Sequence, residues 1–141
     1  MTERTPVART VGEVATLEPV VIDADAPLAD AISLMIDRRI SGLPVTDSGG
    51  RLVGVISQTD LTRLRSTHNL WKQWAGLQVR HLMTSPALAV RVSTPLVSAA
   101  RDMEAAHVHR LVVVDDDDPT LPIGIISTTD IVRTFAEDGL P

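Results

Sequence analysis

The stretch Gly54-Val55-Ile56-Ser57-Gln58-Thr59-Asp60 decides the fold, because it returns as Gly124-Ile125-Ile126-Ser127-Thr128-Thr129-Asp130. Outward from this pair, residues 11–60 align on residues 79–130. The register changes only in the turn between the second and third expected strands of each copy. A repeat of this length and order predicts two copies of one supersecondary unit.

Each copy has the sequence pattern of a βαββα unit, in which the first helix is the clearest element. Its apolar residues recur at i, i+3 or i+4, and i+7, which is the spacing of one helical face. A proline near the first turn, where a missing N–H group costs nothing, marks the start of each helix. The apolar face consists of Leu28, Ala31, Ile32 and Met35 after Pro27, and of Leu96, Ala99, Ala100 and Met103 after Pro95.

The expected strands are short apolar runs, and the middle one of each copy is dense in β-branched residues, which predicts burial. A second helix is expected to begin near Ser57 or Ser127. The turn Asp47-Ser48-Gly49-Gly50 is typical of a hairpin, because glycine accepts positive φ. The expected strands are 20–22, 43–46 and 52–56 in copy one, and 88–90, 111–114 and 123–126 in copy two.

A unit of about 60 residues buries little surface and is marginal alone. We therefore expect an α/β (α+β) fold in which two βαββα repeats pack with pseudo-twofold symmetry and a cleft on each side of the join. The predicted division is an N-terminal segment at 1–10, copy one at 11–67, a linker at 68–78 and copy two at 79–138. Helix is expected around Leu70–Trp74, where Trp71 and Trp74 either anchor a dimer interface or cover the core.

The composition argues against several classes of function. The chain of 141 residues has no cysteine, which removes disulfides, thiolate metal sites and cysteine catalysis. Its apolar runs are far shorter than the roughly 20 residues that span a bilayer, and its N-terminus lacks the layout of a signal peptide. We therefore predict a cytoplasmic protein with no membrane partner. A net charge of −5 weighs against nucleic acid as a partner.

No catalytic residue and no metal ligand is predicted. The sequence has no nucleophile elbow, no P-loop and no assembled metal site, so we do not expect an enzyme. The histidines lack the spacing of a zinc site. The run Asp115–Asp118 offers oxygen atoms to Mg²⁺ or Ca²⁺, but its position before Pro119 favours a solvated acidic loop.

The motif Gly-x-x-Ser-x-Thr-Asp has two interpretations. Ser57 and Ser127 lie where a strand is expected to end and a helix to begin, so they can cap free N–H groups. The same N–H groups and the positive end of the helix dipole also bind phosphate. Most such serines only cap, but the recurrence of the motif at symmetric positions adds weight to the second interpretation.

The motif resembles the signature Gly-hydrophobic-hydrophobic-Ser/Thr-x-x-Asp of the cystathionine-β-synthase (CBS) domain family. In nucleotide-binding members of that family, the aspartate holds the ribose hydroxyls and the Ser/Thr side chains hold phosphate. The resemblance covers nearly the whole chain. It implies ribose ligands at Asp60 and Asp130, and phosphate donors at Ser57, Thr59, Ser127 and Thr129.

The second copy also resembles the gamma subunits of AMP-activated protein kinase over His107-Val108-His109-Arg110-Leu111-Val112-Val113-Val114-Asp115. In that stretch of the gamma subunits, the histidine before the arginine points at nucleotide phosphate. The resemblance implies phosphate contacts at His109 and Arg110. The alternative is two exposed polar residues before a buried strand, the commoner role for such a pair.

In the family each site draws on both copies, so the resemblance implies two unequal sites. In copy one, small residues at the start of the second strand leave room for a flat base. In copy two, the bulky Arg110 stands at the matching position. The main site is expected to contain Ser41, Gly42, Pro44, Val55, His109, Ser127, Thr129 and Asp130. The weaker site is expected to contain Ser57, Thr59, Asp60, Arg110 and Val112.

The leading hypothesis for function is a regulatory module that binds an adenine nucleotide (AMP, ADP or ATP) or S-adenosylmethionine, with no tightly required cofactor. Binding would shift a conformational equilibrium that a partner reads. The family commonly forms flat dimers of such modules, so the resemblance implies a homodimer. The alternatives are a ligand-free interaction scaffold, or a regulatory fragment of a larger enzyme or transporter.

Overall fold

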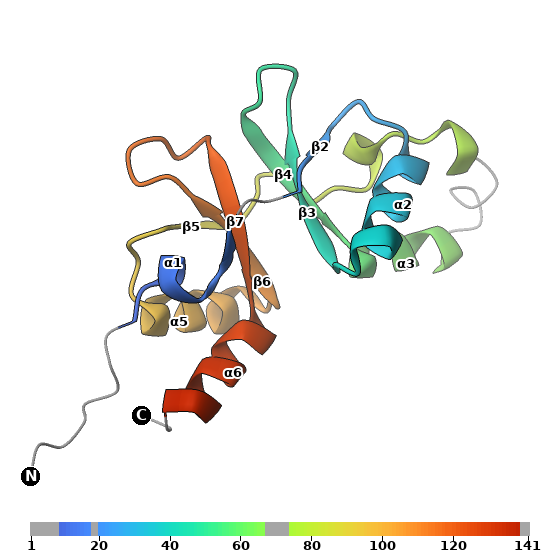
Figure 1. The fold of residues 1–141 in the computed structure, drawn as a ribbon. Helices are drawn as coiled ribbons and strands as arrows, with labels where there is room; N and C mark the ends of the chain where they lie inside the picture. The colour runs from blue at the N-terminus through green and yellow to red at the C-terminus, as the bar shows by residue number, and fades with distance from the viewer. Residues whose placement is uncertain (1–8, 18–19, 67–73, 139–141) are drawn as a thin grey trace, which may run out of the picture. The chain divides into compact units, whose positions relative to one another are not determined.

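The computed structural model describes residues 9–17, 20–66 and 74–138, which form two compact units (Figure 1). The central unit consists of residues 20–66 and 74–88. The C-terminal unit consists of residues 9–17 and 89–138. No helix in these ranges has both the length and the apolar character needed to cross a bilayer.

The central unit contains the expected βαββα order. Strand β2 pairs in parallel with β3, and β3 pairs antiparallel with β4, in the sheet order β2-β3-β4. Two 3₁₀ turns follow the second helix further along the chain. The elements are β2 (Ile22–Asp23), α2 (Leu28–Arg38), β3 (Gly42–Thr46), β4 (Leu52–Ser57), α3 (Gln58–Ser66), η1 (Trp74–Gly76) and η2 (Val79–His81).

The C-terminal unit repeats this order and adds a strand from the start of the chain. Its sheet has the order β1-β7-β6-β5, in which β1 runs antiparallel to β7. The mixed α/β class and the two βαββα repeats are therefore confirmed. The elements are α1 (Val11–Val14), β1 (Thr16–Leu17), β5 (Ala89–Arg91), α5 (Leu96–Ala106), β6 (Arg110–Val114), β7 (Pro122–Ser127) and α6 (Thr128–Asp138).

The helix faces predicted from the spacing are the faces that the structure buries. Leu28, Ala31 and Met35 of α2 lie in the core of the central unit, and Ile32 is partly buried against it. In the C-terminal unit, Leu96, Ala99 and Met103 of α5 are buried in the same way, with Ala100 at the edge. Pro27 and Pro95 each stand one residue before the first helical residue.

The first strand of each copy begins later than predicted. The expected run at 20–22 becomes β2 at Ile22–Asp23, and the run at 88–90 becomes β5 at Ala89–Arg91. Pairing explains the shift, because Ile22 and Asp23 lie opposite Val45 and Thr46 of β3. Val21 precedes this paired register and is exposed. An apolar run becomes strand only where a neighbouring strand accepts its hydrogen bonds.

The linker prediction lies mostly outside the described residues. Residues 67–73, with Trp71, are not described, so the helix expected around Leu70–Trp74 stays a prediction. Trp74 opens the 3₁₀ turn η1, and 38% of its surface is exposed. Trp74 therefore does not serve as a buried core residue.

Each compact unit contains the first segment of the other sequence repeat. Val11 is fully buried in the C-terminal unit, where its N–H donates to the Thr94 carbonyl at 2.8 Å. Val79, its counterpart in the repeat, is fully buried in the central unit and donates to the Ala26 carbonyl at 2.9 Å. The repeats at 11–67 and 79–138 therefore describe the sequence, whereas each folded unit takes its opening segment from the other repeat.

The motif glycines are required by the segments that pack over them. Thr16 of β1 lies along β7, and a Cβ at Gly124 would stand 2.5 Å from its carbonyl oxygen. In the central unit, Thr84 forms a bridge with Val55, and a Cβ at Gly54 would stand 2.8 Å from the Thr84 carbonyl oxygen. Contacts this short force the covering backbone to move, which explains glycine at both positions.

We expect Gly124→Ala to lower the free energy of unfolding by about 1–3 kcal/mol, because the added methyl group overpacks against the backbone of β1. Urea denaturation followed by circular dichroism measures this change. Gly76→Ala is the matched control, since nothing lies within 4 Å of its added Cβ. Equal stabilities of the two variants would contradict this account of Gly124.

Candidate functional site

The serine and aspartate of each motif cap the same helix end reciprocally. Ser127 ends β7 and its N–H donates to Asp130 Oδ2 at 2.9 Å, while the Asp130 N–H donates to Ser127 Oγ at 3.2 Å. The equivalent distances for Ser57 and Asp60 are 2.8 and 3.4 Å. This is the geometry of a capping box. The capping interpretation of the motif is therefore confirmed for these four residues.

The aspartate of each motif is mostly buried, whereas the threonine before it is exposed. The side chains of Asp60 and Asp130 are each 14% exposed, and each carboxylate has Oδ1 at 3.6 Å from an arginine one helical turn later. Those arginines are Arg63 and Arg133. Thr59 and Thr129, the middle residues of the motifs, are exposed. An exposed threonine hydroxyl thus lies beside a partly exposed carboxylate at the start of α3 and of α6.

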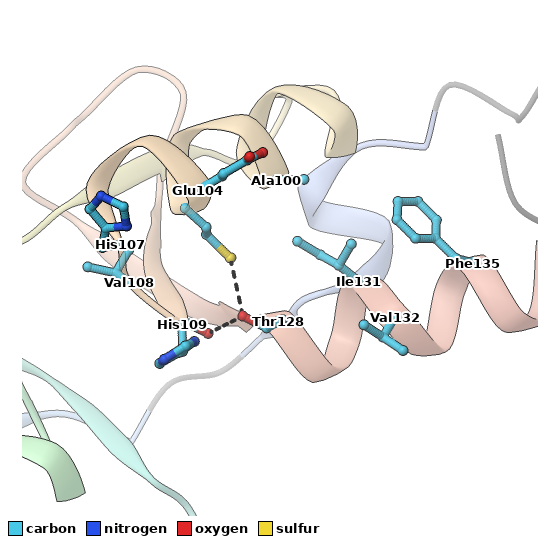
Figure 2. Close-up of a pocket in the computed structure, with 10 residues that line it drawn as sticks. Ala100, Glu104, His107, Val108, His109, Thr128, Ile131, Val132 and Phe135 are labelled. Carbon is cyan, nitrogen blue, oxygen red and sulfur yellow. Dashed lines mark hydrogen bonds between the residues drawn. The ribbon is translucent and has the colours of Figure 1, made fainter.

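His109 lies beside the motif of its own unit, which the sequence alone did not show. The N–H of Thr128 donates to the His109 carbonyl at 2.8 Å, and the Thr128 hydroxyl donates to the same oxygen at 3.1 Å. Figure 2 shows the backbone oxygen of His109 at Thr128 and its imidazole on the side away from α6. Thr128 therefore holds the backbone at His109, a contact that the sequence pattern did not predict. The signal in the sequence was a threonine at an expected helix start, with the polar residue His109 opposite it.

The other predicted site residues lie on the hairpins of the two units. In the central unit, Gly42 pairs with Ser57 and Pro44 with Val55, and the Ser41 carbonyl accepts from the Gln58 N–H at 3.0 Å. In the C-terminal unit, Arg110 pairs with Ser127, and Val112 with Ile125. Each unit thus gathers its own predicted residues around its own motif. The assignment of Ser41, Gly42, Pro44 and Val55 to the site of Asp130 stays a prediction, as does that of Arg110 and Val112 to the site of Asp60.

A groove of about 520 Å³ separates α5 from α6 in the C-terminal unit. His107 ends α5 in the left-handed conformation with φ of 55°, which turns the chain along one end of the groove. In Figure 2 the histidines lie at the end near Thr128, and Val132 and Phe135 lie at the other end. The lining residues are Ala100, Met103, Glu104, His107, Val108, His109, Thr128, Ile131, Val132 and Phe135.

The acidic run between β6 and β7 folds its carboxylates onto local backbone groups. Asp115 Oδ2 accepts from the N–H groups of Asp117 and Asp118 at 3.0 and 3.1 Å. Asp116 Oδ1 accepts from the N–H and the hydroxyl of Ser93. Within the described ranges, no three His, Cys, Asp or Glu side chains come together as metal ligands. The geometry favours the acidic-loop interpretation.

Comparison with known proteins places this geometry in a family. A sequence model of the CBS domain matches residues 11–67 and 79–137. The chloroplastic CBS domain-containing protein CBSX2 of Arabidopsis thaliana is 34% identical over 137 residues, which cover 80% of this chain and 57% of CBSX2. Subunit gamma-3 of the human 5′-AMP-activated protein kinase is 32% identical over 114 residues, 78% of this chain and 23% of the subunit.

Solved structures agree with the sequence comparison. The crystal structure of CBSX2 in complex with AMP superposes with a TM-score of 0.76 at 36% identity, covering 91% of this chain and 96% of that chain. The CBS domain pair of protein MJ0100 in complex with 5′-methylthioadenosine and S-adenosyl-L-methionine superposes with a TM-score of 0.81 at 22% identity, covering 92% and 98%, a likeness of fold alone. The chain spans little more than half of CBSX2 and about a quarter of gamma-3.

We expect Ser127→Ala to lower the free energy of unfolding by about 1 kcal/mol, because the Asp130 N–H loses its acceptor at the helix start. Thr129→Ala is the matched control. The Thr129 hydroxyl is exposed and makes no hydrogen bond among the described residues, so this variant should stay within about 0.5 kcal/mol of the parent. Thermal unfolding of the three proteins measures both changes, and a larger loss for Thr129→Ala would contradict the capping geometry.

Proposed function

Because the chain belongs to the CBS domain family and carries two copies of the domain, we propose that it is a regulatory module that binds an adenine nucleotide or S-adenosylmethionine. The observation that carries this proposal is the set of polar groups around the start of α6, namely the partly exposed carboxylate of Asp130 and the exposed side chains of Thr129 and His109. The AMP complex of CBSX2, 36% identical to this chain, supports the same ligand class.

The chemistry of the α6 start suits a nucleotide. The carboxylate of Asp130 accepts hydrogen bonds, which matches the two donors of a ribose diol. The positive end of the helix dipole attracts phosphate. Thr129 adds a hydroxyl donor, and His109, whose backbone carbonyl Thr128 holds, adds a ring N–H. Ser127 contributes mainly by holding Asp130 in position.

Regulation follows if the ligand binds one conformation of the module more tightly than another. A ligand shifts a conformational equilibrium only by its difference in affinity for the two states. A partner that reads this shift would carry the output, and we propose no catalysis by the chain itself. The cytoplasmic location predicted from the sequence stays a prediction.

AMP at 100 times its Kd should raise the free energy of unfolding by about 2.7 kcal/mol, because it binds only the folded state. A thermal shift assay measures this change.

Isothermal titration calorimetry should give a Kd of AMP for Asp130→Asn that is roughly tenfold to a hundredfold higher than the Kd for the parent chain. This factor corresponds to the free energy of hydrogen bonds to a charged group. Asp60→Asn is the matched control and should change the main Kd little.

Loss of binding in Asp60→Asn but not in Asp130→Asn would reverse the assignment of the main site. The competing function is an interaction scaffold whose Ser and Asp residues serve only as caps. No stabilisation by AMP, ATP or S-adenosylmethionine would favour that scaffold.

We also propose that two chains associate as a homodimer, with the α5–α6 groove as part of the contact. Val132 lines this groove with 59% of its surface exposed, and exposed apolar grooves mark interaction surfaces in proteins. Size-exclusion chromatography with light scattering should give twice the chain mass. We expect Val132→Asp to give the mass of one chain, because a buried unpaired charge is costly.

Leu121→Asp is the control for this dimer. Leu121 is 45% exposed, but it lies in the turn before β7 and not on the groove, so its substitution should leave the mass unchanged. A parent protein with the mass of one chain at all concentrations would contradict the dimer.

A further inference from the structure

The hydroxyl of Thr84 contacts the carboxylate of Asp60. Thr84 Oγ1 donates to Asp60 Oδ1 at 3.2 Å. The backbone holds Thr84 in this place, since its N–H donates to the Val55 carbonyl at 2.8 Å and its carbonyl accepts from the Val55 N–H at 3.0 Å. The position of the hydroxyl is thus set by strand pairing beside β4 and does not depend on the side-chain contact itself.

The remaining acceptor positions of Asp60 are also in use. Asp60 Oδ2 accepts from the N–H of Ser57 at 2.8 Å and from its hydroxyl at 3.1 Å. Oδ1 lies 3.6 Å from Arg63 Nη2, and the same nitrogen donates to the Leu82 carbonyl, which anchors the guanidinium. A carboxylate offers about four lone-pair sites. Three hydrogen bonds and one ion pair leave little acceptor capacity on Asp60.

Asp130 has the same place in the repeat but fewer donors. Its Oδ2 accepts from the Ser127 N–H, and its Oδ1 lies 3.6 Å from Arg133 Nη1. In the part of the chain that the structure describes, no hydroxyl donates to the Asp130 carboxylate. Thr16 is the counterpart of Thr84 and pairs with Ile125 along β7, yet its side chain makes no hydrogen bond to Asp130 there.

We propose that Thr84 is a built-in competitor at Asp60, and that it determines which of the two motifs accepts a ribose diol. A vicinal diol needs free acceptor positions on the carboxylate. At Asp130 they are present, whereas at Asp60 the ligand has to displace the Thr84 hydroxyl first. This inference rests on the proposed function, because it assigns the unequal affinity of the two sites to one side chain.

The test uses AMP titrations of the full chain by isothermal calorimetry in an Asp130→Asn background, where only the Asp60 site remains intact. Thr84→Val removes the hydroxyl and keeps the β-branched shape, so the backbone pairing with Val55 should persist. The Kd of AMP for Thr84→Val/Asp130→Asn should be roughly tenfold lower than its Kd for Asp130→Asn alone. This factor corresponds to the free energy of one hydrogen bond to a charged group.

Two further variants separate competition from a change in structure. Thr16→Val/Asp130→Asn makes the same change at the mirror position and should leave the Kd of Asp130→Asn unaltered. Thr84→Ser/Asp130→Asn restores a hydroxyl, so its Kd of AMP should be as high as that of Asp130→Asn alone. Circular dichroism melts of all variants establish that each one is folded.

The outcomes distinguish this inference from the proposed function. AMP binding by the parent chain, with no gain in Thr84→Val/Asp130→Asn, would overturn the role of Thr84 and leave the proposed function standing. An equal gain in Thr16→Val/Asp130→Asn would also overturn it. No binding of AMP, ATP or S-adenosylmethionine by any variant would overturn both.

Discussion

At the end of β7 the backbone of Ser127 and the backbone of Asp130 each use the other residue's side chain as an acceptor, and Ser57 and Asp60 do the same after β4. A helix start leaves backbone N–H groups without partners, so this exchange determines where the strand ends and the helix begins. The positions of the neighbouring groups follow from it. Thr128 can hold the His109 carbonyl only because α6 begins at that residue.

The two oxygen atoms of each motif carboxylate have different partners. Oδ2 of each aspartate belongs to the cap, and Oδ1 lies 3.6 Å from the arginine one helical turn later. The structural role is equal in the two units, because the capping distances are nearly the same. The outer oxygens differ, since Thr84 reaches Asp60 and no hydroxyl among the described residues reaches Asp130. Unequal sites can therefore arise from two almost identical motifs.

Because the opening segments are exchanged, each folded unit contains residues from both sequence repeats. Val11 and Val79 complete cores built from the other repeat, and the segments that follow them cover the sheet edges beside β7 and β4. An uncovered edge strand invites pairing with other chains. The cover also explains why Gly54 and Gly124 stand three residues before the capping serines, because a side chain there would collide with it.

Local patterns in the sequence determined the two copies, the order of their elements, the buried faces of α2 and α5 and the capping role of Ser57 and Ser127. These features depend on residues within a few positions of one another, and periodicity or a cap reports such neighbours directly. The pairing of Val11 with Thr94, the start of β2 at Ile22, the place of His109 beside Thr128 and the groove between α5 and α6 were decided by tertiary structure. So was the difference between Thr84 and Thr16, which the sequence shows as the same residue at matching positions. Hydrogen bonds between distant segments depend on distance and direction in space, and a linear pattern of residue types contains neither.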